Sequence, residues 1–250
     1  MSLKKDKLIK YSLILGIIIS LVFLKINHKN LPSVISDSSN IKAAIIPHHL
    51  LAQKLIEDLG EKISSHKKIK KIFIIGPNHN EVGKGPILTE NNQFKNNHIV
   101  EDKQTLLNDH SCWVPKSILK EYLLNVEINC ILIGSKADIQ YLQEIAKEIS
   151  VNSQENLLVI STDFSHYLNK NQADENDLIT QELINKKDVD SVLKLDNGFV
   201  DSLKSLAFLF FYLKEINSSS QKIINHLNSS QILNQPNLTS TTSYFEILFF

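Results

Sequence analysis

The chain has 250 residues, of which 42% are hydrophobic and 22% charged, and its formal net charge is zero. These proportions are those of an ordinary globular protein, so they exclude a largely disordered chain. Every basic residue is Lys and none is Arg, which removes the planar guanidinium that grips phosphates and base edges at two points. Nucleic acid is therefore not an expected partner.

The N-terminal segment has the pattern of a signal anchor. Several lysines precede an uncharged run of 14 residues, Tyr11 to Leu24, and Lys25 follows it. The run is shorter than the roughly 17 to 25 residues that span a bilayer, which favours a cleaved signal, but residues 24–27 lack the small side chains of a cleavage site. We expect an uncleaved single-pass transmembrane helix within residues 1–29, lengthened by snorkelling lysines.

The lysines also predict an orientation. Their excess before the apolar run keeps the N-terminus in the cytoplasm and places the globular domain outside it, at the cell membrane. Residues 30–40, rich in Ser and Asn, are predicted to form a linker.

Residues 41–250 alternate apolar runs of strand length with helical periodicity. Strands are expected at 41–46, 71–75, 128–133, 157–160, 222–227 and 241–250, and helices at 50–59, 109–123, 139–149, 174–186 and 201–216. This alternation predicts one α/β domain with a mostly parallel central sheet and helices on both faces. In such sheets ligands bind beyond the carboxyl ends of the strands.

Histidines follow three of these predicted strands. His48 follows the first strand, His79 the second, and Asp163 and His166 come after the strand at 157–160. If these strands are near neighbours, the side chains converge on one edge of the sheet. A single His at a strand end is more often a solvated loop residue, but three at three strand ends favour a site for a divalent metal ion, which His and carboxylate groups bind.

Other histidines have weaker patterns. His49 ranks behind His48, because two adjacent residues rarely face the same ion. His110 lies in the first turn of a predicted helix capped by Asp109. There the helix dipole disfavours the charged imidazole, so His110 is either a neutral donor or base, or a polar residue of the cap. His226 alternates with apolar neighbours and is expected to be a core or edge residue.

Two cysteines are too few for a disulfide framework. Cys130 lies in the apolar run 128–133 and is expected to be a small buried hydrophobic residue. Cys112 lies beside Trp113 in the helix start, and the sequence does not establish its reactivity.

Short motifs in this order resemble those of the Memo family, also called the AmmeMemoRadiSam system protein B family, whose fold is related to class III extradiol dioxygenases (LigB-like). The resemblance covers nearly all of the globular part. It is carried by Pro47-His48, by Phe73 to His79, by Asp109-His110-Ser111, by Val159 to His166, by Asn228 to Gln231 and by Thr242-Ser243-Tyr244.

The resemblance implies a metal site and also departs from it. In family members with a described site, two histidines matching His48 and His79 act with a cysteine after the Ser-Ser-Gln segment. That position is Ile232 here, which cannot bind a metal. Trp113 replaces a usual glutamate, and Asp201-Ser202-Leu203-Lys204 replaces a Gly-Arg-His-Pro stretch. Asp163, His166 or water would then have to complete the metal shell.

Two functions remain open from the sequence. One is a metal-dependent enzyme with oxidative, dioxygenase-like chemistry, in which His48 and His79 bind the metal and His166, Asp163 and His110 are the candidate catalytic residues. By the resemblance, iron or copper is expected before zinc, although the site could also lack a metal. The other is a non-catalytic module that binds a ligand or protein on the same scaffold, as Ile232 favours. A serine hydrolase is not favoured, since Ser111 and Ser165 lie in no Gly-x-Ser-x-Gly elbow.

Overall fold

The computed structural model describes residues 41–250 except 66–67, 92 and 96. The described residues belong to one compact unit, Asn40–Phe250. The expected transmembrane helix and linker lie outside the described residues. Among the helices that are described, none has the length and apolar character needed to cross a membrane.

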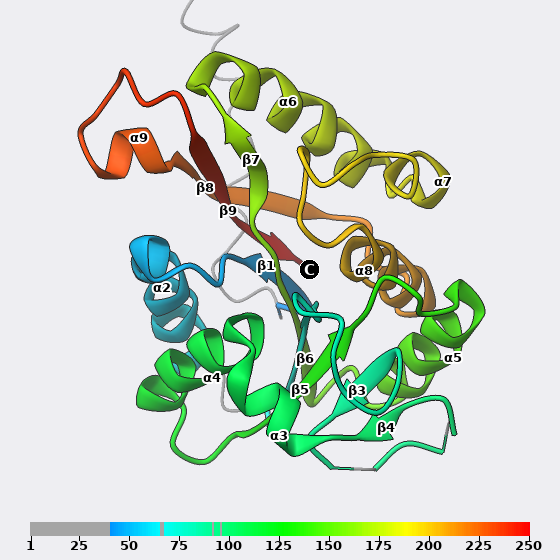
Figure 1. Ribbon diagram of the computed structural model, residues 1–250. Coiled ribbons are helices and arrows are strands. Elements are labelled where there is room, and N and C mark those ends of the chain that lie inside the picture. Colours follow the sequence, from blue (N-terminus) through cyan, green and yellow to red (C-terminus); the bar gives the residue numbers. More distant parts are fainter. Residues whose placement is uncertain (1–40, 66–67, 92, 96) are drawn as a thin grey trace, which may run out of the picture. The chain divides into compact units, whose positions relative to one another are not determined.

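Nine strands of the described chain form a single sheet (Figure 1). Their order is β4-β3-β5-β2-β6-β1-β9-β7, and β8 pairs with β9. The strands are β1 (Ala43–Ile46), β2 (Lys71–Pro77), β3 (Ile87–Thr89), β4 (Val100–Glu101), β5 (Glu127–Ile133), β6 (Asn156–Ser161), β7 (Phe164–Leu168), β8 (Gln221–Asn228) and β9 (Thr241–Phe249).

The expectation of a mostly parallel sheet needs correction. The central neighbours β5, β2, β6 and β1 are parallel, but β3 runs antiparallel to β5, and β9 runs antiparallel to β1, β7 and β8. A parallel pair needs a crossover connection, usually a helix. β8 and β9 are joined only by residues 229–240, which contain one four-residue helix, α9 (Ser229–Ile232), so β9 returns in the opposite direction.

Helices cover both faces of the sheet, as the strand and helix order predicts. Besides α9 they are η1 (Leu50–Ala52), α2 (Gln53–Ser64), α3 (Lys103–Asn108), α4 (His110–Tyr122), α5 (Ile139–Ser150), α6 (Lys170–Lys186), α7 (Val189–Val192) and α8 (Leu203–Glu215). In Figure 1, α2 and α4 lie on one side of the central strands and α5 and α8 on the other.

The sequence of the central strands explains this arrangement. Successive side chains of a strand point to opposite faces, and both faces are buried here. Ile45 and Ile75 join the cluster under α5 and α8, whereas Ile46 and Ile74 join the cluster under α2 and α4. Strands buried on both faces are continuous apolar runs rather than alternating ones, which is why these strands were predictable.

Strand β7 was not predicted. No strand was expected between 160 and 174, but residues Phe164–Leu168 pair with β9. The pairing register shifts on both sides of His166, and Tyr167 has a positive φ of 60°. Such a bulged, polar edge strand lacks the alternating pattern by which strands are recognised.

Candidate metal centre

Three neighbouring strands end at the position where the histidines begin. In the order β2-β6-β1, the register pairs Ile46 with Ser161 and Ile75 with Ile160. The residues that follow each strand therefore lie at one edge of the sheet. The structure places His48, His79 and Asp163 together there, as the positions of their strands require.

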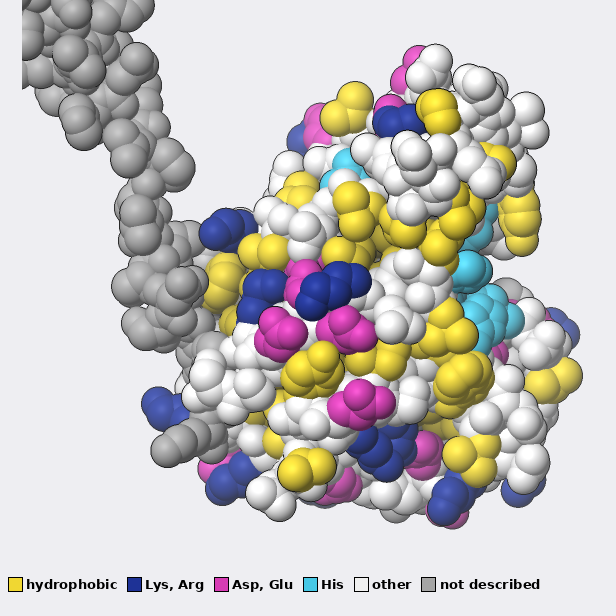
Figure 2. Space-filling model, turned by 90° about the vertical axis from the view of Figure 1, so that its left-hand side faces the viewer, with side chains coloured by type: hydrophobic (Ala, Val, Ile, Leu, Met, Phe, Trp, Pro, Cys, Tyr) yellow, Lys and Arg dark blue, Asp and Glu magenta, His cyan; other side chains and the backbone are white. Residues whose placement is uncertain are grey.

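A third ring joins this group from α4. The ring of His48 lies 4.9 Å from that of His79 and 4.8 Å from that of His110, and the rings of His79 and His110 stack at 4.1 Å. One nitrogen of each lies within 4.8 Å of the others. His48 is buried, while His79 and His110 reach the surface, where Figure 2 shows histidine side chains gathered at one edge of the described domain.

A hydrogen bond at Nδ1 orients the ring of His48. Its Nδ1 lies 3.2 Å from Ser161 Oγ, and that hydroxyl donates to the Ser111 carbonyl at 2.6 Å. Because the serine proton is donated to Ser111, the neutral imidazole of His48 donates through Nδ1, and its lone pair is on Nε2. Fixing one nitrogen in this way is how proteins orient metal-binding histidines.

A hydrogen bond orients His79 in the same way. Its Nδ1 lies 2.9 Å from Asp109 Oδ1, and its backbone N–H donates to Oδ2 at 3.0 Å. Asp109 is also the N-cap of α4, because Oδ1 accepts from the backbone N–H of Ser111 at 3.0 Å. The predicted cap therefore has a second task, which is to hold His79 with Nε2 directed away from it.

The site also contains Asp201, which the sequence did not indicate. Its Oδ2 lies 3.0 Å from His48 Nε2 and 3.6 Å from His79 Nε2. This oxygen is buried, yet it has no aligned hydrogen-bond partner among the described residues. A buried carboxylate oxygen between two imidazole nitrogens can be satisfied either by protons on those nitrogens or by a cation that all three groups share.

Asp201 was missed because its local sequence resembles an ordinary helix start. It stands directly before Ser202, which caps α8 through Ser205 N–H, and sequence comparison identified this stretch only as a departure from the Memo pattern. Its position depends on a distant contact, since its backbone N–H donates to the Asp163 carbonyl at 3.1 Å. No local signal in the sequence reveals that contact.

The charges at this edge are strongly coupled. Burial lowers the pKa of His79, but the hydrogen bond to Asp109 and the close pairing with Asp201 outweigh that effect and raise the pKa to about 9. Burial also lowers the pKa of His48, but the charges of Asp163 and Asp201 outweigh this effect. The pKa of His48 is therefore raised. Burial raises the pKa of Asp201, but the pairing of its carboxylate with His48 and His79 outweighs that effect and holds the pKa below its ordinary value.

His110 differs from the other two rings. Burial, together with the charges of His48 and His79, lowers its pKa to about 4. It is therefore neutral at physiological pH, as its place in the first helical turn suggested. The principal cause, however, is burial and the two neighbouring rings.

Asp163 and His166 complete the surroundings without joining the three rings. Asp163 Oδ1 accepts from the backbone N–H of His48 at 3.1 Å, and its Oδ2 lies 3.8 Å from His48 Nε2. Burial and the charge of Asp201 raise the pKa of Asp163. On β7, His166 Nδ1 is buried without a hydrogen-bond partner among the described residues. A positive charge on this ring would act to lower the pKa of both Asp163 and Asp201.

The remaining candidates lie apart from these contacts. His49 is exposed, accepts from Leu51 N–H and stacks against Tyr244. His226 pairs with buried Asp177 at 2.7 Å and lies against Phe245, as expected for a structural residue. Ile232 packs against an apolar cluster that includes Tyr244 and offers no ligand.

The two cysteines are bonded to each other, which corrects the view of Cys130 as an unpaired hydrophobic residue. Cys112 in α4 and Cys130 in β5 form a disulfide, and both are buried. Ligand atoms of Glu90, Cys112 and Cys130 lie within 4.8 Å of one another. Because the sulfurs are oxidised, they present no thiolate, and the histidine edge is the better donor set.

The donor chemistry of the histidine edge fits a divalent ion. Two imidazole lone pairs and one carboxylate oxygen face each other, and their other atoms are held by Ser161, Asp109 and Thr162, whose hydroxyl donates to Asp201 Oδ1. Two histidines and one carboxylate are the ligands of many non-haem iron sites. His110 provides a fourth nitrogen at the same place.

Comparisons with known proteins agree with this fold. The sequence model of the Memo-like protein family matches residues 88–247. The chain is also similar to a solved structure, that of uncharacterized protein JW3007 from Escherichia coli K12, at 11% sequence identity and a TM-score of 0.52, over 81% of this chain and 98% of that chain. No curated protein matches the chain.

Proposed function

Because the chain belongs to the Memo-like protein family, we propose that its domain binds one divalent metal ion between His48, His79 and Asp201. The observation that carries this proposal is the position of the buried Asp201 Oδ2, which lies 3.0 Å from His48 Nε2 and 3.6 Å from His79 Nε2. This carboxylate takes the place of the ligand that Ile232 does not provide. Iron is the ion that such a donor set favours, and copper is the alternative.

The surrounding residues suit a small substrate handled at the open side of the site. A bound iron or copper ion would supply redox chemistry or Lewis acidity. His110, neutral and at the surface, can donate a hydrogen bond to a substrate or accept one. His166, whose Nδ1 has no hydrogen-bond partner within the described part of the chain, is proposed as the acid or base, and Asp163 holds the backbone of His48 in place. Dioxygenase-like chemistry is proposed from the resemblance of the family's fold to class III extradiol dioxygenases.

The second candidate function is a binding module without catalysis. Ile232, in the position of a metal-binding cysteine in the family, is the observation that favours it. In that case the paired charges of His79, Asp109 and Asp201 would serve to hold the edge together, and a ligand or protein would bind over the histidines.

The pH dependence of metal binding tests the proposal. Metal binding must displace the proton of His79, whose pKa is about 9, so metal affinity should rise by about tenfold per pH unit below that value for each proton released. Titration with Zn²⁺ and Fe²⁺ against a competing chelator, from about pH 6 to about pH 9, measures this slope. An affinity independent of pH, or no bound ion at all, would leave the binding-module candidate.

The metal-free protein should respond to pH with the opposite sign. Its folded His79 has a pKa raised from 6.5 to about 9, so protonation stabilises the fold fully below 6.5. That stabilisation is lost as pH rises through about 9. Thermal unfolding of the metal-free protein provides this control, since its midpoint should fall over the window in which metal affinity rises.

We further propose that the domain is held at the outer side of the cell membrane by an N-terminal helix. The lysine pattern around residues 11–24 supports this topology, and the Cys112–Cys130 disulfide is of the kind that persists outside the cytoplasm. A C-terminal fusion to a reporter enzyme that is active only after export should be active. An active fusion to a reporter that folds only in the cytoplasm would contradict the proposed orientation.

A further inference from the structure

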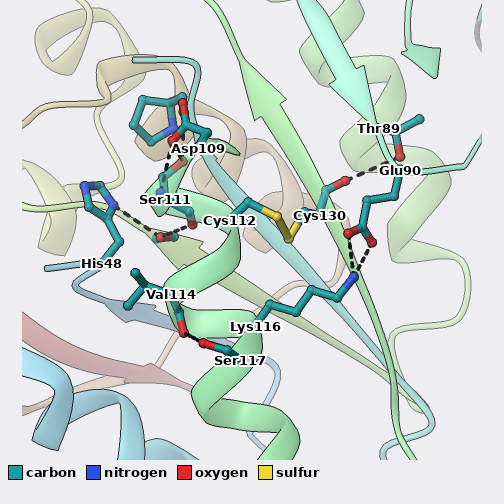
Figure 3. The surroundings of a disulfide bond; sticks show 12 residues. His48, Thr89, Glu90, Asp109, Ser111, Cys112, Val114, Lys116, Ser117 and Cys130 are labelled. Atoms are coloured by element: carbon teal, nitrogen blue, oxygen red, sulfur yellow. Dashed lines mark hydrogen bonds and ion pairs between the residues drawn. A yellow bond between two sulfur atoms is a disulfide. The ribbon is translucent and has the colours of Figure 1, made fainter. Parts of the chain in front are cut away.

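The Cys112–Cys130 disulfide lies directly behind the metal centre. Cys112 belongs to the first turn of α4, two residues after His110, and Cys130 lies in β5 opposite Ile74 of β2. Figure 3 shows the bond between helix and strand, with His48, Asp109 and Ser111 on one side and Glu90 and Lys116 on the other. The bond therefore joins α4, which contributes His110, to β5. β5 in turn pairs with β2, the strand that His79 follows.

The N-terminus of α4 is hydrogen-bonded directly to His79 and, through Ser161, to His48. The Asp109 carboxylate is hydrogen-bonded to His79 Nδ1. The Ser111 carbonyl accepts a hydrogen bond from Ser161 Oγ, and this hydroxyl lies 3.2 Å from His48 Nδ1. That carbonyl is available because Pro115, four residues later, has no N–H with which to make the helical hydrogen bond. A displacement of this turn would therefore turn both imidazoles.

The turn is also packed with little freedom. The Ser111 hydroxyl donates to the Pro77 carbonyl at 2.8 Å, and a Cβ added at Gly76 would lie 2.7 Å from the Ser111 oxygen. These contacts set the distance between α4 and the end of β2. The disulfide is a covalent link between α4 and the sheet, and Cys112 is the residue directly after Ser111.

We propose that the Cys112–Cys130 disulfide is a positioning element of the metal centre, which holds the first turn of α4 so that Asp109 and Ser161 orient His79 and His48. This inference rests on the proposed metal site and adds to it a dependence on redox state. Breaking the bond by a phosphine, which is oxidised to its oxide with oxygen from water, leaves two thiols and frees the turn from β5.

The test compares the double variant Cys112→Ala, Cys130→Ala with the wild-type protein. Affinity for Co²⁺ is measured from its visible absorption, and unfolding is followed separately in the metal-free proteins. We expect the double variant to bind Co²⁺ about tenfold or more weakly, as when residues that orient metal ligands are removed, and its Co²⁺ spectrum to change. Wild-type protein reduced by the phosphine and then freed of it should show the same loss.

Leu119→Ala is the matched control, because Leu119 is fully buried in the other half of α4. It should lower the unfolding temperature and leave Co²⁺ affinity and spectrum unchanged. If the double variant unfolds at a lower temperature yet binds Co²⁺ as wild type does, the positioning role is refuted while the metal site stands. If wild-type protein binds no Co²⁺ in either redox state, both proposals are refuted. If the double variant does not fold, the reduced wild-type protein decides.

Discussion

Replacing His48 or His79 by Ala is expected to abolish near-stoichiometric metal binding. Each imidazole presents one lone pair at Nε2 when it is neutral, since Nδ1 is engaged by Ser161 or Asp109, so each replacement removes a direct ligand. Loss of a direct ligand should weaken affinity by more than the roughly 10- to 100-fold that loss of a ligand's partner costs. Elemental analysis of the purified variants and calorimetric titration measure the effect.

His49→Ala is the matched control for this experiment. His49 adjoins His48 in the sequence but stacks against Tyr244 and caps the short helix η1. Its replacement should leave metal content unchanged. Retention of the metal in His48→Ala, with loss in His49→Ala, would show that the wrong member of the pair has been assigned.

Replacing Asp201 by Asn is expected to weaken metal binding by about 10- to 100-fold at every pH, because an amide oxygen is a poorer ligand than a carboxylate at nearly the same size. The variant should also shift the pH profile. Asp201 is one of the groups that raise the pKa of His79, so without its charge the proton of His79 leaves at lower pH.

These two effects separate a metal ligand from a counter-ion. If Asp201 only compensates the charge of protonated His48 and His79, the variant would equal wild type above about pH 9, where His79 is already neutral. A deficit that persists there identifies Asp201 as a ligand. Chelator-buffered titration with Zn²⁺ on both sides of that pH makes the distinction, and equal affinities at the higher pH would overturn the assignment.

The site could be predicted from the sequence where it depends on strand ends. His48, His79 and Asp163 each follow an apolar run, and the rule that parallel strands end at a common edge brought them together correctly. The N-cap of α4 was also visible, because Asp109 precedes a helical pattern. That local signal placed His110 at a helix start but did not show that its ring would stack on His79.

Asp201, the disulfide and the antiparallel edges were beyond the reach of sequence patterns. Asp201 is brought to the histidines by its backbone hydrogen bond to Asp163, a residue far earlier in the chain. Cys112 meets Cys130 only because α4 packs over β5. Strand β7 carries no hydrophobic alternation, so its pairing with β9 depends on neighbours and not on its own residues.

The sequence by itself determined which segments of this protein become the central strands and the long helices that cover them, and therefore which side chains stand at the end of each central strand. This is because hydrophobic periodicity and capping act over a few residues. Only the tertiary structure decided which of those side chains share one point in space. Asp201 could be brought between two imidazoles, and Cys112 against Cys130, only by the packing of elements that are distant along the chain.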